Sequence, residues 1–253
     1  MITSGSNSSV SSVRKLIKSA KARAKARAFC VEGEKLIAEA LEAGFSLQQL
    51  FYVGATPAIA SDGELVEVSE DIMASMASTV SAQPQLAVFA MPDETQASLG
   101  SFVPVLVGVN DPGNLGAIAR SSEGAGVSTI MTVGDTVDRF NPKVIRASAG
   151  SIFRVSFMAF DELSVAVDEL KARGYKTYAT AVTADAGVSH TEADLANCAV
   201  VFGSEAHGLS ESEVQLCDEV VAIETEGKLE SLNLAASVAV IGFESKRQRA
   251  KSS

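Results

Sequence analysis

PVLVGVNDPGNLGAIARSSEGAG, residues 104–126, is the stretch of sequence that decides the fold. PVLVGV is an apolar run that predicts a buried strand, and the segment after NDPGN predicts a helix. A buried strand that leads directly into a helix is the repeating unit of α/β proteins with a parallel sheet.

The remainder of the chain continues this alternation. We expect helices at NPKVIRASAG, ELSVAVDELKARG and LNLAASVAVIGFESKRQ, and strands at VSTIMTVG, FRVSFMAF, KTYATAV, CAVVFG and EVVAIET. The short connections indicate a mostly parallel sheet with helices on both faces. The last helix is apolar almost all round from Leu234 to Phe243, so it must be buried on more than one side, in the core or against a second subunit.

The first part of the chain predicts a smaller α/β unit. Residues 10–27 predict one helix with basic residues between its apolar positions, and FCVEGEKLIAEALEAG predicts a second helix that ends at Gly44. LQQLFYVG, ELVEVS and LAVFAMP predict strands, and SEDIMASMASTV a helix. MPDETQASLG is a polar connector, so we expect one domain over residues 1–95 and another over residues 96–253.

The charge of the chain is unevenly distributed. The net charge is −10, yet residues 1–27 hold seven basic residues and no acid, and residues 246–251 hold four more. A polyanion responds to the local field rather than to the net charge. The basic N-terminal helix is therefore either a solvated surface helix or an RNA contact, and its narrow, alanine-rich apolar stripe disfavours membrane insertion.

Composition excludes several classes of protein. The chain is 47% hydrophobic and 21% charged, as in soluble globular proteins, and has no apolar run long enough to span a membrane and no secretory signal. Its three cysteines, Cys30, Cys198 and Cys217, show no C-x-x-C spacing, which disfavours disulfides and zinc and favours a reducing, cytoplasmic location. We expect the cysteines to be buried small hydrophobes.

Three loops follow predicted strands, where α/β sheets bind their ligands. In NDPGNLGAIAR, Asn114 can cap the helix and Arg120 lies six residues on, although a lone helical arginine is usually just solvated. The loop lacks the spacing of a dinucleotide-binding turn, and no phosphate-binding loop motif occurs in the chain.

The other two loops are VVFGSEAHGLS, residues 200–210, and IETEGKLESLNLAAS, residues 223–237. In the first, the glycines permit close approach of backbone to a ligand, and Glu205 either has a partner or only faces a helix dipole. In the second, Ser231 and Asn233 open a helix, and Ser231 is either a plain N-cap or a site residue.

Taken together and in this order, NDPGNLGAIAR, FGSEAHGLS and IETEGKLESLNLAAS resemble the three motifs of the SpoU/TrmH-type RNA ribose methyltransferases of the SPOUT superfamily. The resemblance covers residues 105–245. RAFCVEGEKLIAEAL also resembles the L30e-like substrate-binding domain often found ahead of this catalytic domain.

The resemblance implies a C-terminal trefoil knot, a homodimer, an RNA substrate (rRNA or tRNA) and S-adenosylmethionine as methyl donor, without metal or membrane. It places the cofactor against the backbone of Gly203, Ile223 and Leu232, with Glu205, Gly208 and Asn233 close by. The run of apolar residues would then stop at Gly203 to expose backbone to the cofactor.

The implied reaction is methyl transfer to a ribose 2′-hydroxyl. Arg120 matches the family's catalytic arginine, and because a guanidinium rarely loses its proton we expect it to bind phosphate and stabilise the developing alkoxide. A phosphate or water would take the proton, and Asn114, Glu205, Ser231 and Asn233 would hold Arg120 and the ribose in place. Ile223-Glu224-Thr225 stands where relatives commonly carry I-P-M, which adds negative charge near the cofactor.

Two other functions stay open at this point. A non-catalytic RNA-binding protein could keep the fold and the basic ends, but it would not need Arg120, Glu205 and Asn233 together. A nucleotide-dependent α/β enzyme is disfavoured by the missing phosphate-binding patterns.

Overall fold

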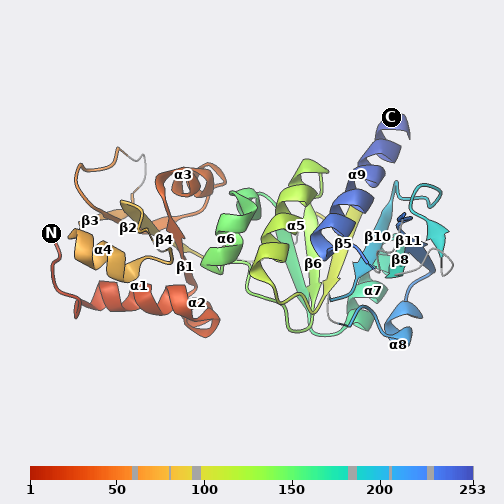
Figure 1. Cartoon of the computed structure of the whole chain (residues 1–253), viewed down its shortest axis with the longest axis horizontal. Coiled ribbons are helices and arrows are strands. Elements are labelled where there is room, and N and C mark those ends of the chain that lie inside the picture. The colour runs from red at the N-terminus through yellow and green to blue at the C-terminus, as the bar shows by residue number, and fades with distance from the viewer. Residues whose placement is uncertain are drawn as a thin grey trace. The chain divides into compact units, whose positions relative to one another are not determined.

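The computed structural model describes residues 1–58, 62–79, 81–92, 98–181, 187–204, 207–226 and 231–252. The chain forms two compact units (Figure 1). The first consists of Met1–Asp93 and Asp138–Phe153, and the second of Glu94–Val137 and Arg154–Ser253. No helix in the described ranges has both the length and the apolar character that crossing a bilayer requires.

The second unit is built on a seven-stranded sheet in which every pairing is parallel, as the sequence predicts. The strand order is β7-β6-β5-β10-β8-β11-β9. The strands are β5 (Phe102–Val107), β6 (Thr129–Val133), β7 (Ser156–Phe160), β8 (Lys176–Ala181), β9 (Val188–Ser189), β10 (Cys198–Phe202) and β11 (Glu219–Ala222). The two central strands β5 and β10 read as continuous apolar runs because helices cover the sheet on both faces.

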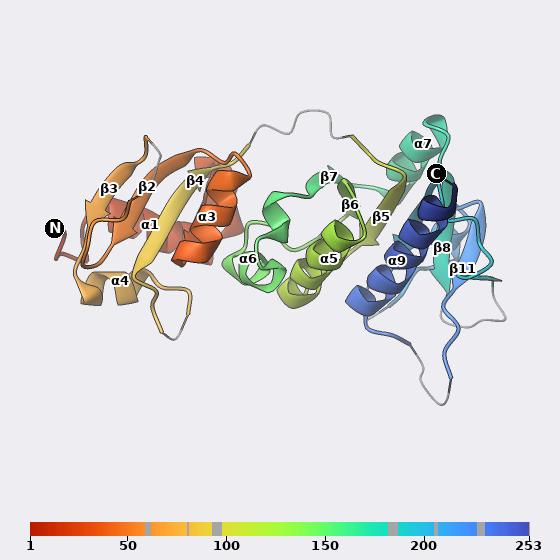
Figure 2. The ribbon, with the colours of Figure 1, turned by 90° about the horizontal axis from the view of Figure 1, so that it is seen from above.

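Helices α5 (Pro112–Gly124) and α9 (Leu234–Ser252) lie side by side against one face of this sheet (Figure 2). Helix α7 (Leu163–Ala172) covers the other face, where Ala166 and Leu170 pack with Val105 and Val201 from the central strands. The short helix α8 (Glu211–Val214) follows β10 and has a complete capping box at Ser210. The α/β fold class with helices on both faces is therefore confirmed.

Helix α9 is buried along one side only. Leu234, Val238 and Ile241 are buried, whereas Val240 and Phe243 are 36% and 48% exposed. The buried side packs on α5 and β5. Within one copy of the chain, the apolar residues on the other side of α9 stay at the surface.

The first unit has a four-stranded mixed sheet of order β1-β4-β2-β3. Strands β1 and β2 pair antiparallel with β4, and β3 pairs parallel with β2. The strands are β1 (Ala28–Glu32), β2 (Leu47–Tyr52), β3 (Glu64–Glu67) and β4 (Gln85–Ala90); the helices are α1 (Ser8–Lys18), α2 (Ala20–Ala26), α3 (Glu34–Glu42), α4 (Glu70–Met76), α6 (Pro142–Ser148) and a 3₁₀ turn, η1 (Ser151–Phe153). Strand β1 is not predicted by the sequence pattern, because AFCVE runs directly into the helical pattern of α3.

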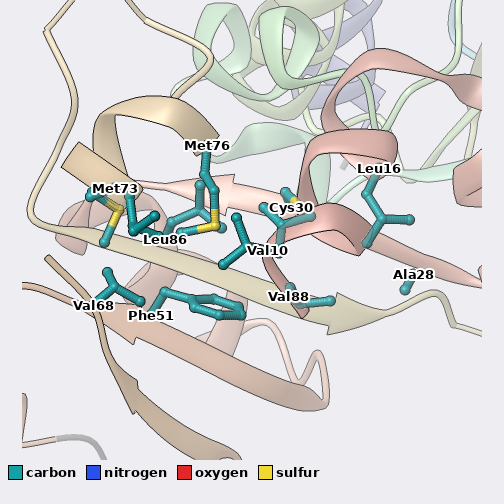
Figure 3. Close-up of a cluster of buried hydrophobic side chains, with 12 residues drawn as sticks. Val10, Leu16, Ala28, Cys30, Phe51, Val68, Met73, Met76, Leu86 and Val88 are labelled. Atoms are coloured by element: carbon teal, nitrogen blue, oxygen red, sulfur yellow. The ribbon is translucent and has the colours of Figure 1, made fainter. Parts of the chain in front are cut away.

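One face of this small sheet carries an aliphatic and thioether core from α1 and α4. Figure 3 shows Val10 and Met76 directed at strand residues that include Leu86 and Val88. All four side chains are at most 5% exposed. The periodic apolar residues of α1 therefore serve as core.

The opposite face carries phenylalanines, two of them from the distant segment 138–153. The ring of Phe140 stacks on Phe29 with centroids 4.2 Å apart, and Phe153 packs edge-on against Phe45 at 5.3 Å. Such aromatic pairs contribute about 0.5–1.5 kcal/mol beyond their buried area. This segment lies in sequence between β6 and β7 of the second unit, yet it completes the core of the first.

The single basic helix expected over residues 10–27 is wrong. The chain breaks at Ser19, whose extended backbone ends α1 and whose hydroxyl accepts a hydrogen bond from the N–H of Ala22 to begin α2. Arg23, one of the supposed surface cations, is 2% exposed. Its guanidinium pairs with Asp138 at 2.5 Å and donates to the carbonyl oxygen of Leu16 at 2.6 Å.

Candidate functional site

The carboxyl ends of the parallel strands β5, β10 and β11 meet at one edge of the second unit's sheet. The loops after β5 and β10 approach one another there, since a Cβ added at Gly108 would lie 4.0 Å from the Cβ of Ser204. All the site residues that the sequence analysis selected belong to this unit.

Asp111 caps α5. Its Oδ1 accepts a hydrogen bond from the N–H of Asn114 at 2.8 Å, and Pro112 occupies the first helical position. The expectation that Asn114 is the cap is therefore wrong. Aspartate followed by proline is a known helix-start signal, and it identifies Asp111 in the sequence. Because Asp111 does the capping, the side chain of Asn114 can make other contacts.

Asn233 caps α9 and also binds Asn114. Its Oδ1 accepts from the N–H groups of Ala235 and Ala236 at 3.0 and 3.4 Å. Its Nδ2 donates to Oδ1 of Asn114 at 3.0 Å. The plain N-cap interpretation of Ser231 is therefore wrong: Ser231 is exposed, and among the described residues its hydroxyl has no hydrogen-bond partner.

Arg120 lies on the exposed surface of α5, six residues after Asn114. Six residues advance a helix by about 9 Å and turn it by about 240°. Within the described part of the chain, the guanidinium forms no hydrogen bond or ion pair. The structure thus joins Asn114 to Asn233 directly, whereas Arg120 and Ser231 remain available to a ligand.

Gly203 packs against the backbone of its own loop. A Cβ at this position would lie 2.2 Å from the carbonyl carbon of Gly208 and 2.6 Å from the nitrogen of Leu209. The N–H of Gly208 donates to the carbonyl oxygen of Ser204 at 2.9 Å, and Gly208 has φ +64°. A glycine is required at position 203 by this close approach, which is a different reason from the expected exposure of backbone to a cofactor. Glu205 lies outside the described residues.

Ile223 and Leu232 are half-buried, one just after β11 and the other just before α9. No backbone hydrogen bond ties either residue to another described residue. Backbone amide and carbonyl groups that have no partner among the described residues suit the edge of a purine, which carries both donors and acceptors. The residues present therefore fit the adenine end of S-adenosylmethionine.

The cysteines offer no reactive thiol. Burial raises the pKa of Cys30 and of Cys198 to about 12, and that of Cys217 to about 11. Cys30 and Cys198 are buried, as expected, and Cys217 is half-buried. Among the described residues, no group of three or more histidine, cysteine or acidic side chains could hold a metal ion.

A basic groove lies on α1 and α2 of the first unit. We call it the lysine groove: it has a volume of about 560 Å³, and its exposed cations are Lys15, Lys18, Lys21 and Lys25. Arg14, at its margin, is held by the carbonyl oxygens of Gly5 and Ser75. Residues 1–27 hold seven basic residues, but Arg14 is bound to carbonyl oxygens and Arg23 is buried, so fewer cations are available to a ligand than the composition suggests.

Two protein-family models match this chain. Residues 101–243 match the SpoU rRNA Methylase family, and residues 7–87 match the MRM3-like substrate binding domain. The chain is 32% identical to the 23S rRNA (guanosine(2553)-2′-O)-methyltransferase RlmP of Bacillus subtilis over 96% of this chain and 97% of that protein.

Two further proteins cover most of the chain. The 23S rRNA (uridine(2479)-2′-O)-methyltransferase of Streptomyces viridochromogenes is 27% identical over 90% of this chain and 85% of its own length. The AdoMet-bound crystal structure of an rRNA methyltransferase from Sinorhizobium meliloti superposes with a TM-score of 0.85 and 28% identity, over 97% of each chain.

Proposed function

The chain belongs to the SpoU rRNA methylase family, and on that premise we propose that it methylates a ribose 2′-hydroxyl of ribosomal RNA. The observation that carries the proposal is the meeting of two family motifs through the Asn233–Asn114 hydrogen bond at the carboxyl edge of a parallel sheet. S-Adenosylmethionine supplies the electrophilic methyl group when bound.

The chain's own residues have separate tasks in this proposal. Backbone groups of Gly203, Ile223 and Leu232 hold the cofactor, with Gly208 and Asn233 beside them. Arg120 binds a phosphate next to the target ribose and stabilises the negative charge that develops on the 2′-oxygen. Asn114, Ser231 and Asn233 position the ribose, and Glu205 belongs to the same group by its place in the motif. A phosphate or a water accepts the proton, because arginine does not lose its own.

The identity of the methylated base stays open within this proposal. The relative from Bacillus subtilis carries guanosine in its name, and the one from Streptomyces viridochromogenes carries uridine. Proteins that match nearly the whole chain thus act on different bases of the same RNA. We propose large-subunit rRNA as the substrate without assigning the base.

The lysine groove supports RNA binding by the first unit. Its four exposed lysines carry charges that can neutralise phosphates, which is the main source of affinity in nucleic-acid binding. Residues 1–95 act in this proposal as the substrate-binding domain and residues 96–253 as the catalytic domain.

Dimerisation, the knot and the cellular location complete the proposal. A homodimer is supported by Val240 and Phe243, apolar side chains that α9 leaves exposed. A trefoil knot is compatible with a strand order that inserts β10 between β5 and β8 before α9 returns to α5. A cytoplasmic location is supported by the free cysteines Cys30, Cys198 and Cys217, which suit a reducing compartment.

Methyl transfer from labelled S-adenosylmethionine to rRNA tests the function. We expect the wild-type chain to methylate 23S rRNA or its assembly intermediates, and Arg120→Ala to reduce the rate about 10²–10³-fold while cofactor affinity is kept. Arg173→Ala, which removes an exposed arginine from the same unit, is the matched control. Mapping of methylated riboses in RNA from cells with and without the gene identifies the nucleotide.

Two outcomes would contradict the proposal. Full activity of Arg120→Ala would remove the catalytic assignment of that residue. RNA binding by the wild-type chain, without methyl incorporation into any rRNA, would favour a non-catalytic RNA-binding protein.

A further inference from the structure

The first unit contains an open cavity of about 660 Å³, away from the lysine groove. It is lined by the junction of β1 and α3, by the loop after α4 and by Arg146 of α6. Cavities of about 300–1,000 Å³ are the size that small ligands occupy. The sequence motifs do not include this cavity, and the match to the MRM3-like substrate binding domain over residues 7–87 assigns no role to its individual residues.

Hydrogen bonds to Glu32 connect the floor of the cavity to the loop after α4. The carboxylate of Glu32 accepts hydrogen bonds from the backbone N–H and the hydroxyl of Ser78 at 2.9 and 2.6 Å, from the hydroxyl of Thr79, and from the N–H of Gln83 at 3.3 Å. Burial alone would raise the pKa of Glu32, but these hydrogen bonds outweigh it and lower the pKa. Because donors surround both oxygens, Glu32 is a structural anchor for the loop.

Arg146 has N–H donors in this cavity that bind no described residue. Its side chain is half-buried, and Nη1 donates to the hydroxyl of Ser78 at 2.6 Å. A guanidinium has five N–H donors in a planar fork, and in the described part of the chain no other group accepts from Arg146. The remaining edge and the plane of the guanidinium can therefore serve a ligand.

The rest of the lining combines one more cation with a small apolar surface. Lys35 is exposed and forms no ion pair with a described residue, while Leu36 and Ala38 provide aliphatic surface. The acid Glu34 is exposed at the margin and can accept hydrogen bonds from exocyclic amino groups. A ligand that fits has an anionic group, a flat apolar face and a polar edge.

We propose that this cavity is a subsite for one unpaired nucleotide of the RNA substrate. Its phosphate binds Arg146 and Lys35, and its base lies against Leu36 and the guanidinium plane. Proteins recognise single-stranded RNA by such stacking on side chains and arginine planes, together with hydrogen bonds to base edges. The inference rests on the proposed function, which makes RNA the substrate, and it adds an RNA contact whose residues differ from those of the lysine groove and of the methyl-transfer site.

The test uses the whole 253-residue chain and fluorescently labelled nonaribonucleotides of each base composition, with a nine-base-pair duplex for comparison. We expect Lys35→Gln and Arg146→Gln each to weaken single-strand binding at least about fivefold and to lower the salt slope by about one. Arg146→Lys, which keeps the charge but loses the planar fork, should be intermediate. Lys143→Gln, an exposed cation on the same helix outside the cavity, should stay within twofold of wild type.

Thermal unfolding and cofactor binding are measured on every variant. Lys35→Gln breaks no hydrogen bond or ion pair with a described residue, so it keeps the test valid even if Arg146→Gln weakens the fold. If the wild-type chain methylates rRNA but both cavity variants bind all oligonucleotides as it does, the subsite is wrong and the proposed function stands. If the cavity variants lose affinity equally for the duplex and for the single strands, the assignment of the cavity to an unpaired nucleotide is also wrong. If the wild-type chain neither binds nor methylates RNA, the proposed function fails and the subsite fails with it.

Discussion

The side-chain amide of Asn233 donates a hydrogen bond to the side-chain oxygen of Asn114 across 119 residues of the chain, with 3.0 Å between Nδ2 and Oδ1. Each residue stands in the first turn of a helix, Asn114 in α5 and Asn233 at the start of α9. This contact fixes the relative position of the two helix starts at the carboxyl edge of the sheet. Substitutions at this contact should therefore change the rate of methyl transfer and the thermal stability to different extents.

Asn114→Ala should lower methyl transfer with little change in thermal stability. The variant removes the acceptor for Asn233 but leaves the α5 cap at Asp111 intact. Asn233→Ala should lower both, because it also removes the α9 cap, a loss of about 0.5–2 kcal/mol. Asn114→Asp keeps the acceptor and should retain the most activity of the three. Equal activity of Asn114→Ala and wild type would contradict a positioning role.

Gly203→Ala should abolish cofactor binding and lower the melting temperature. The added methyl group would lie 2.2 Å from the carbonyl carbon of Gly208, so the backbone at Gly203 or at Gly208 and Leu209 must shift. Gly242→Ala is the control, because its methyl group would meet neighbours no closer than 3.4 Å and alanine favours a helix interior. Calorimetric titration with S-adenosylmethionine and thermal unfolding check both variants. Cofactor affinity within twofold of wild type in Gly203→Ala would show that the loop tolerates displacement.

Most of the second unit could be predicted from the sequence, because its strands are continuous apolar runs and its turns carry strong helix signals. The helix N-caps are harder to predict from the sequence. Asparagine and aspartate both suit an N-cap, and only the structure shows that Asp111 occupies it while Asn114 turns to Asn233. The three loops could be selected as a site from residue types, but their contacts required the fold.

The structure of the first unit is less predictable from the sequence, because it depends on contacts that no local sequence pattern marks. The break at Ser19 has no proline or glycine to mark it, and the cap that creates it is one hydroxyl. Phe140 packs on Phe29 across a long stretch of chain, and no local pattern signals such a contact. Arg23 looks like a solvated cation until its partner Asp138 is known.

The lysine groove should set the salt dependence of RNA binding. Replacing Lys15, Lys18, Lys21 and Lys25 by glutamine should lower the salt slope by about 0.7–0.9 per lysine that contacts a phosphate. The matched control replaces the same four residues by arginine and should keep the slope. Deleting residues 1–27 is the poorer experiment, because it also removes the core residues Val10, Val13 and Leu16. An unchanged slope in the glutamine variant would exclude the groove as an RNA contact.

The Arg23–Asp138 pair should stabilise the first unit strongly. Arg23→Gln leaves Asp138 without its ion-pair partner and removes the guanidinium donor to the carbonyl oxygen of Leu16, so we expect a loss of about 3–5 kcal/mol in unfolding free energy. Arg173→Gln breaks an exposed pair with Glu169 and should cost about 0.3–0.5 kcal/mol. Urea unfolding of both variants measures the difference. Similar costs for the two would mean that the Arg23 pair is solvated in solution.

Glu32 should make the stability of the first unit depend on pH in the acid range. Burial raises its pKa, but the hydrogen bonds from Ser78, Thr79 and Gln83 outweigh burial and hold the pKa below the ordinary value of about 4.3. A carboxylate with a lowered pKa stabilises the folded state fully above that ordinary value, and the contribution is lost as the pH falls through the lower folded pKa. Glu32→Gln should therefore be less stable than wild type at pH 7, with a gap that closes progressively below about pH 4. Glu34→Gln, which replaces an exposed carboxylate that accepts no hydrogen bond from a described residue, is the control. Thermal unfolding between pH 7 and pH 3 measures the gap, and one that stays constant over this range would show that the charge on Glu32 is not what stabilises the loop.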